Sequence, residues 1–262
     1  LLVASCLDGG VRDAVLPRME WSELRVSPLG RPDCERFIRD HLAKYRKSLT
    51  PGQEALVLAH PLCGNPLFLR TLLEELRVFG VHEELDLRLA HYLASGTIDD
   101  LFERVLERVE SDNTPATVRA ALEVLWAAKE SFAEDELLAV SALAPAAWAP
   151  IHIALDESLI GAGGRIAFSH DYLRKAVEDR YLSSERDRHR IQKSLAEFCA
   201  QAMAGGRKEV SRYVRRHAVE HFLEAGDWDN AAAALSDLEF IEARAIAQEL
   251  PAMLKDYAGV EQ

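Results

Sequence analysis

The chain has 262 residues, with 31 Lys or Arg against 43 Asp or Glu, so its formal net charge at pH 7 is −12. Hydrophobic residues make up 48% and charged residues 28%, a globular balance that excludes a disordered chain. A chain this acidic is a poor general binder of polyanions, so nucleic-acid binding would need a local basic patch. The length allows one large domain or two to three small ones.

The N-terminal residues predict strands rather than a targeting segment. Leu1 to Ser5 is apolar but lacks the basic flank of a signal peptide, and the first residue is not Met. We therefore expect a chain cut from a longer protein that begins inside a buried strand. A second short strand is expected at Glu23 to Val26. So few strands are predicted that a complete doubly wound sheet cannot be built from these residues.

Most of the following chain reads as helices of ten to fifteen residues with clear start signals. Thr50 to Gln53 has a capping Thr, a Pro at the first helical position and a Gln three residues after the cap. Thr114-Pro115 and Asn65-Pro66 repeat the arrangement of cap and proline. Ser131 to Glu134 is expected to be another capping box.

Residues 115–182 predict three helices, a hairpin and a fourth helix, which is the order of a winged helix. Between Leu137 and Leu155 there are 19 residues without an Asp, Glu, Lys or Arg, but internal prolines favour two short buried helices over a membrane span. The hairpin is expected because Gly161-Ala162-Gly163-Gly164 supplies glycines that tolerate positive φ. The expected elements are helices 115–129, 133–141, 148–158 and 171–182, and strands 159–160 and 166–168.

Helices are again expected at 186–204, 210–225 and 228–235, and the joint at His221 to Trp228 resembles that of an α-solenoid repeat. His217 and His221 stand four residues apart and could share a metal ion, but without a third ligand a surface pair is favoured. Four widely spaced cysteines contain no CxxC pair, which favours reduced, mostly buried thiols.

Two constellations could bind a ligand. In Gly64 to Arg70, a glycine allows close backbone approach, a proline presents a flat apolar face, and a helix starting at Asn65 would point free N–H groups outward. In Phe168 to Arg174, His170 stands at a helix start, where imidazole and backbone N–H groups suit a phosphate. The alternative for each is a helix cap beside a core aromatic residue.

The order of these pieces resembles the second half of a STAND-class P-loop NTPase, most closely the NACHT-type ATPases of telomerase-associated and nephrocystin-like proteins. The residues that carry the resemblance are Gly64 to Gly80 and Phe168 to Val177, supported by Ser27-Pro28-Leu29 and by Leu101 to Glu107. It covers nearly all of residues 1–240. It implies a mainly α (α+β) fold: the end of a P-loop α/β core (1–26), a helical lid (27–95), a winged helix (96–182) and a helical arm (183–262).

The resemblance also implies a nucleotide site. Gly64, Asn65 and Pro66 would form the motif whose proline packs on adenine, and His170 would contact the β-phosphate in the closed, ADP-bound state. Ser5 would end the strand beside the γ-phosphate, although family members often place an arginine just after this strand and this chain has Ser5-Cys6-Leu7. No GxxxxGK[ST] loop occurs here, so the phosphate-binding loop and the residues that hold Mg²⁺ would lie upstream of Leu1.

The resemblance therefore implies part of a cytoplasmic ATP/ADP-dependent signalling switch. Its partners would be the upstream P-loop core and either further copies of itself or another protein, with no membrane involved. The parent protein would be an ATPase, whereas this chain alone should not hydrolyse ATP, because neither catalytic residues nor metal ligands are expected in it.

The alternative function is a nucleic-acid-binding winged helix. From Arg174 to Arg216 there are twelve Lys or Arg and six acidic residues, so this segment carries +6. The helix expected to enter a groove, at 148–158, has no Lys or Arg, and the hairpin offers only Arg165. We therefore expect no nucleic acid here, and the basic segment should meet acidic residues of the same molecule or a partner.

Overall fold

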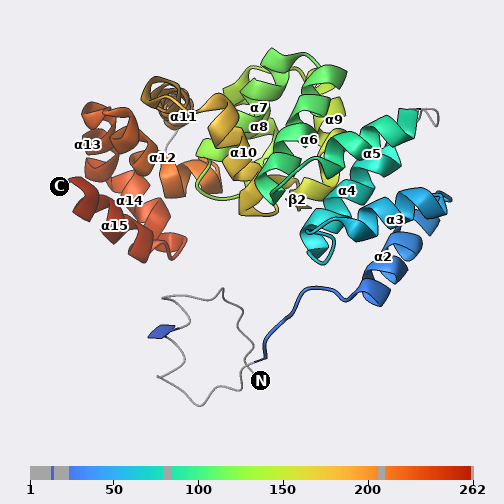
Figure 1. The fold of residues 1–262 in the computed structure, drawn as a ribbon. Helices are drawn as coiled ribbons and strands as arrows, with labels where there is room; N and C mark the ends of the chain where they lie inside the picture. The colour runs from blue at the N-terminus through green and yellow to red at the C-terminus, as the bar shows by residue number, and fades with distance from the viewer. Residues whose placement is uncertain (1–12, 15–23, 79–83, 206–209, 261–262) are drawn as a thin grey trace.

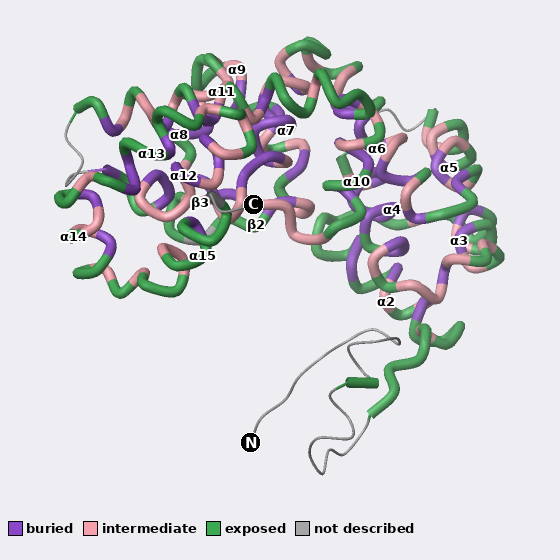
Figure 2. Tube along the Cα trace, turned by 90° about the vertical axis from the view of Figure 1, so that its left-hand side faces the viewer, coloured by how far each residue is buried: buried purple, intermediate pink, exposed green. Residues whose placement is uncertain are grey.

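A computed structural model describes residues 13–14, 24–78, 84–205 and 210–260 of the chain, and these are mainly helical with one three-stranded sheet. This confirms the predicted mainly α fold with few strands. Figure 1 shows helices α2–α5 on the right, a central group with the sheet, and helices α11–α15 on the left. Figure 2 shows the buried residues along the inner faces of the helices.

Residues 27–95, which we call the lid after the sequence prediction, contain four helices in their described part: α2 (Arg31–Ala43), α3 (Pro51–Ala59), α4 (Pro66–Val78) and α5 (Leu85–Leu93). Helix α4 is its centre, because α2 and α5 both pack against it and its residues 68, 69, 72, 73 and 76 are buried. The capping box predicted at Thr50 is confirmed: the Gln53 N–H donates to Thr50 Oγ1 (3.3 Å) and the Thr50 N–H donates to Gln53 Oε1 (2.9 Å).

The central group has the connectivity of a winged helix. After α6 (Ile98–Asp112) come α7 (Pro115–Ala127), β1 (Phe132–Ala133), α8 (Glu134–Ser141), α9 (Pro145–Ala154), the 3₁₀ turn η3 (Asp156–Ser158), β2 (Leu159–Ala162), β3 (Arg165–Phe168) and α10 (Asp171–Tyr181). The sheet order is β1-β3-β2, and both pairings are antiparallel. Helix α10 packs on α6 and α7, so it closes the group.

Three details of this group differ from the sequence prediction. Ser131 does not cap a helix; strand β1 follows it, and Glu136 accepts the Ala133 N–H (3.1 Å) at the start of α8. The helix expected to end at Ser158 ends at Ala154, where the chain tightens into η3. Thr114 precedes α7, but its side chain forms no capping hydrogen bond.

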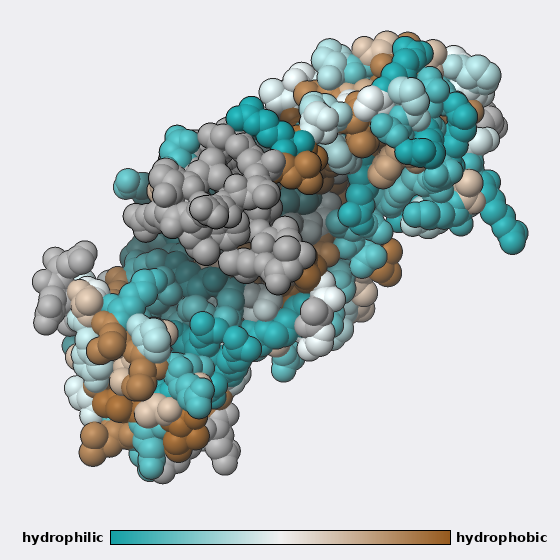
Figure 3. Space-filling view, turned by 90° about the horizontal axis from the view of Figure 1, so that it is seen from below, coloured by the Kyte–Doolittle hydropathy of each residue, from teal (hydrophilic) through white to brown (hydrophobic). Residues whose placement is uncertain are grey.

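The arm comprises α11 (Glu185–Ala204), α12 (Arg212–Ala225), α13 (Trp228–Ser236), α14 (Leu238–Ile246) and α15 (Leu250–Val260). Helix α12 contacts the other four and supplies much of a second buried apolar cluster. Gly226 adopts a φ of 72° between α12 and α13, a conformation that favours glycine. Apolar side chains stay exposed on α14 and α15, and Figure 3 shows hydrophobic atoms gathered at this end.

The expected N-terminal strands are not borne out where they can be tested. Residues 24–26 form no strand, and Leu24 and Val26 are 87% and 91% exposed. Leu1 to Ser5 lies outside the described residues, as does Glu23.

The uncharged stretch forms two helices, α8 and α9, which are bent by 116° relative to each other. Within the described ranges, no single helix is long and apolar enough to cross a membrane.

Candidate functional site

The turn before α4 needs a glycine because the chain packs closely against it. The Leu29 N–H donates to the Gly64 carbonyl oxygen (2.8 Å), which binds the loop of Pro28 and Leu29 to this turn. A Cβ on Gly64 would lie 3.1 Å from the Leu29 oxygen and 3.2 Å from the Pro28 Cβ. Gly64 therefore holds the entry of the lid against the start of α4.

Asn65 caps α4 and leaves few free donors there. Its Oδ1 accepts the N–H groups of Leu67 (2.9 Å) and Phe68 (3.2 Å), while Pro66 has no N–H. The expectation of outward-pointing N–H groups at this helix start is therefore wrong, because the side chain of Asn65 satisfies them. Pro66 is exposed at the first helical position, so its ring is open to contact.

His170 stands immediately before α10 and makes no capping hydrogen bond with its side chain. Its ring packs against that of Phe102 on α6, with centroids 4.7 Å apart. Its Nδ1 is buried and finds no hydrogen-bond partner on another residue of the described chain. Burial lowers the pKa of His170, and the positive charge of Arg70 lowers it further, so the imidazole is neutral at pH 7.

The structure brings helix α4 and the His170 step to the same cavity. This cavity has a volume of about 180 Å³ and is lined by α4 residues from Leu67 to Val78, by the end of α9 and the η3 turn, and by Ser169 and His170. The charged residues of the α4 wall are Arg70, Glu74, Glu75 and Arg77. Gly64, Asn65 and Pro66 lie just before its α4 wall rather than in its lining, and Ser5 lies outside the described residues.

An ion pair between Arg70 of α4 and Glu157 of η3 crosses the cavity wall and links the lid to the winged helix. The same two residues also line a neighbouring cavity of about 480 Å³, whose other lining residues come mainly from α2. Arg70 therefore stands between two cavities. Glu157 has no local signal in the sequence, because only the folded chain brings it to Arg70 from 87 positions away.

A buried polar network lies beside the cavity, at the junction of α4, α5 and α6. Arg108 makes a two-pronged ion pair with Glu75, in which its Nη2 lies 2.9 Å from Oε1, and it also donates to the Ala154 oxygen at the end of α9 (3.2 Å). The Tyr92 hydroxyl donates to Glu75 Oε2 (2.6 Å). Burial and the Glu75 carboxylate raise the pKa of Tyr92.

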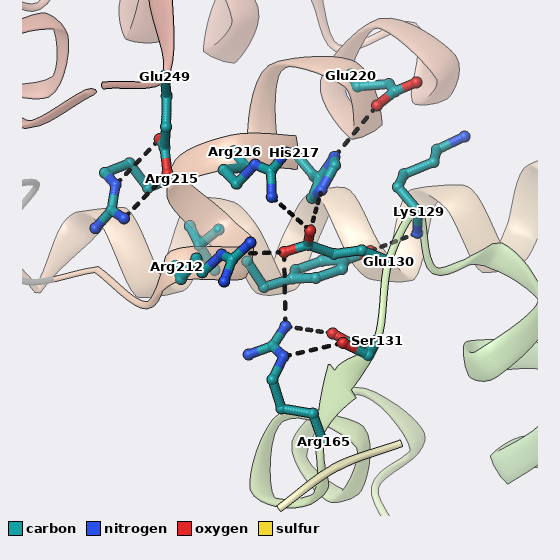
Figure 4. A network of polar contacts seen from close by, with 12 residues as sticks. Lys129, Glu130, Ser131, Arg165, Arg212, Arg215, Arg216, His217, Glu220 and Glu249 are labelled. Atoms are coloured by element: carbon teal, nitrogen blue, oxygen red, sulfur yellow. Dashed lines mark hydrogen bonds and ion pairs between the residues drawn. The ribbon is translucent and has the colours of Figure 1, made fainter. Parts of the chain in front are cut away.

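A second polar network joins the winged helix to the arm (Figure 4). The Glu130 carboxylate lies 2.7 Å from Arg216 Nη1 and 3.7 Å from nitrogens of Arg165, Arg212 and His217. One carboxylate before β1 thus holds cations from the hairpin and from α12. Nothing in the local sequence singled out Glu130, because its partners lie 35 or more positions away.

The basic segment pairs with acidic residues of the same chain, as the sequence analysis expected. Eight of its cations in the described ranges form ion pairs with carboxylates, and most of these carboxylates lie on α6, on α7 or in the arm. The eight cations are at positions 175, 180, 188, 190, 193, 212, 215 and 216. Arg165 likewise bonds within the chain, to Ser131 and Glu130. Most of the positive charge on the described part of this segment is therefore compensated within the chain.

His217 and His221 are not the surface pair that the sequence favoured. His221 is fully buried, with Nε2 2.7 Å from the Tyr213 hydroxyl and Nδ1 3.0 Å from Gln192 Oε1. Burial lowers its pKa to about 3, so it is neutral. Among the described residues, no group of three His, Cys, Asp or Glu could hold a metal ion.

The cysteine prediction is confirmed for the three described cysteines: Cys34, Cys63 and Cys199 are free and buried. Burial raises the pKa of Cys63 and of Cys199 to about 12, which keeps both as thiols.

The lining of the cavity at His170 carries charges of both signs. Arg70, Arg77 and the uncapped start of α10 would favour an anion, whereas four carboxylates, Glu74, Glu75, Asp156 and Glu157, also line it. Two of these carboxylates are already paired, Glu74 with Arg77 and Glu75 with Arg108.

No family model matches the sequence, and no solved structure matches it. The chain is similar to a TPR repeat-containing protein of Dictyostelium discoideum, with 26% identity over 243 residues. The similarity covers 90% of this chain and 14% of the relative, so the chain spans a small part of that protein's length.

Proposed function

We propose that this chain is the lid, winged-helix and arm portion of an ATP/ADP-dependent switch NTPase of the STAND class, with a NACHT-type arrangement. The observation that carries the proposal is the cavity that brings the α4 start and His170 together. These are the two motifs on which the sequence resemblance rests, and they are about a hundred residues apart. Ordinary helix capping would not require them to share one cavity.

In the proposed switch, the nucleotide joins the two modules. Pro66, exposed at the start of α4, packs on the adenine, while the phosphate end reaches His170. A neutral imidazole donates one N–H to a phosphate oxygen, and the uncapped start of α10 adds backbone donors. Exchange of ADP for ATP removes the histidine contact and lets the winged helix move, because a ligand shifts an equilibrium only through its different affinity for the two states.

The remaining parts of the proposal rest on the resemblance. The phosphate-binding loop and the Mg²⁺ ligands belong to an upstream core of a cytoplasmic parent ATPase, and opening exposes a surface for self-assembly or for another protein. The helical arm and the TPR repeats in the name of the Dictyostelium relative both fit a polypeptide that carries helical repeats.

We do not propose the nucleic-acid alternative. Helix α9, which would enter a groove, has no Lys or Arg, and the basic residues around it are paired within the chain. Phosphate neutralisation dominates the affinity of DNA-binding proteins, so the cations would need to be available there.

Nucleotide binding by the full-length protein tests the proposal. Pro66→Ala should weaken ADP and ATP alike by about 1–2 kcal/mol, because the adenine contact is common to both. His170→Ala should weaken ADP about ten- to a hundredfold and ATP less, since a charge-assisted hydrogen bond contributes about 1.5–3 kcal/mol. His189→Ala, at an exposed position on α11, is the matched control.

Thermal melting with and without ADP separates binding from folding. Because His170 also packs on Phe102, alanine should lower the melting temperature even without ligand. The proposal requires that ADP raise the melting temperature of the wild type more than that of the His170 variant. Equal ADP-induced shifts would make His170 a purely structural residue and contradict the proposed mechanism.

A further inference from the structure

The Arg70–Glu157 ion pair has a position that helix capping and core packing do not explain. It joins the second turn of α4 to the η3 turn of the winged helix, and both residues line the cavity that holds His170. The side chains are 51% and 33% exposed, so the pair is open to solvent and to solutes. Solvent-exposed pairs of this kind contribute little to stability, so competing anions readily displace one partner.

We propose that Arg70 and Glu157 form an anion-operated latch, in which a phosphate group entering the cavity displaces Glu157 and takes its place on Arg70. This inference rests on the proposed function and adds its regulation. Without ligand, the lid and the winged helix are joined directly by the carboxylate of Glu157. With ligand, the phosphate joins them instead, held by Arg70 on one side and by His170 on the other.

The surroundings of Arg70 support an exchangeable partner. The cavity of about 180 Å³ has room for a phosphate group, and two of the four carboxylates that line it, Glu74 and Glu75, are held by Arg77 and Arg108. Burial lowers the pKa of His170 and that of His41, and the positive charge of Arg70 adds to both shifts. A guanidinium binds phosphate and carboxylate through the same planar donor geometry, so the two anions compete for one site.

The latch predicts opposite effects for its two halves. In the full-length protein, Glu157→Gln should tighten the binding of ADP about two- to fivefold, because it removes the competing carboxylate. Arg70→Gln should weaken it about ten- to a hundredfold, and Arg70→Lys less, because the charge remains. In the double variant the Glu157 change should add nothing, because Glu157 acts only through Arg70.

Calorimetric titration with ADP, and separately with inorganic pyrophosphate, measures these effects. Glu197→Gln, in the exposed Lys193–Glu197 pair of α11, is the control and should bind as the wild type does. If pyrophosphate also shows the opposite effects of the two variants, the latch responds to phosphate itself. If only ADP shows them, it responds to the nucleotide's phosphate.

Three results would contradict the latch. In the first, the wild type binds ADP and Pro66→Ala and His170→Ala weaken this binding, but Arg70→Gln and Glu157→Gln leave it unchanged. The latch is then wrong and the proposed function stands. Weaker binding by Glu157→Gln would also overturn the latch. If the wild type binds neither ADP nor pyrophosphate, both proposals fail together.

Discussion

The buried pair of Glu75 and Arg108 offers the most quantitative test of how the lid is held. Both side chains are about 5% exposed, and the guanidinium meets the carboxylate with two nitrogens. Removing one partner of a buried pair leaves the other charge without compensation, which costs about 3–5 kcal/mol. We therefore expect Arg108→Met to lower the free energy of unfolding of the lid by about that amount, because Glu75 would retain only the Tyr92 hydroxyl.

The double variant Glu75→Leu/Arg108→Met should recover much of this loss. Replacing both charges with apolar side chains removes the uncompensated carboxylate, and such replacements are often close to neutral. Tyr92 would lose its acceptor, so a residual cost of about 1–3 kcal/mol is expected. The difference between the double variant and the sum of the single ones gives the coupling energy.

Urea unfolding, followed by far-UV circular dichroism and by Trp fluorescence, measures this loss of stability in the lid. The lid, residues 27–95, contains no Trp, whereas Trp126 and Trp148 lie in the winged helix, Trp228 lies in the arm and Trp21 precedes the lid in the sequence. Far-UV dichroism therefore reports the helices of every part, and the fluorescence comes from residues outside the lid. In Arg108→Met, the dichroism transition should begin at lower urea than the fluorescence transition. Single variants within about 1 kcal/mol of the wild type, or strictly additive effects, would refute the reasoning.

Three further predictions concern other parts of the chain. His221 has a folded-state pKa near 3 and an unfolded-state pKa near 6.5, so its contribution to the free energy of unfolding falls as the pH drops below 6.5, by about 2 kcal/mol at pH 5. His221→Gln should therefore flatten the pH dependence of urea unfolding. The control variant at an exposed position, His189→Gln, should not. Glu130→Gln should leave its arginines without their shared carboxylate and speed limited proteolysis between winged helix and arm. Gly64→Ala should lower the melting temperature, whereas Gly52→Ala, whose Cβ meets nothing within 4 Å, should not.

Local sequence signals predicted the elements whose stability is local. The capping box at Thr50, the hairpin between β2 and β3, and most helix positions followed from residues within a few positions of one another. Strand β1 escaped prediction because two residues carry no periodicity, and its pairing partner Ile166 lies 34 positions away from Phe132.

The candidate site was predictable only in part, for the same reason. His170 and the start of α4 each had a local signal, and the fold supplied what the sequence could not, namely the cavity between them. In the sequence, three glutamates of these networks look like ordinary acidic residues of polar faces: Glu75, Glu157 and Glu130. Their role shows only once the fold has placed an arginine beside each of them. Long-range ion pairs leave no mark in a single sequence, whereas caps and hairpins do.

The energies at the lid junction are of the size that a nucleotide switch needs. Moving a two-state equilibrium from 1:99 to 99:1 takes about 5.5 kcal/mol of differential binding. Two charge-assisted contacts to a phosphate, from Arg70 and His170, would supply about 3–6 kcal/mol together. Because these two amounts are comparable, under the proposed function a change in how one phosphate is held would suffice to decide whether this junction stays closed.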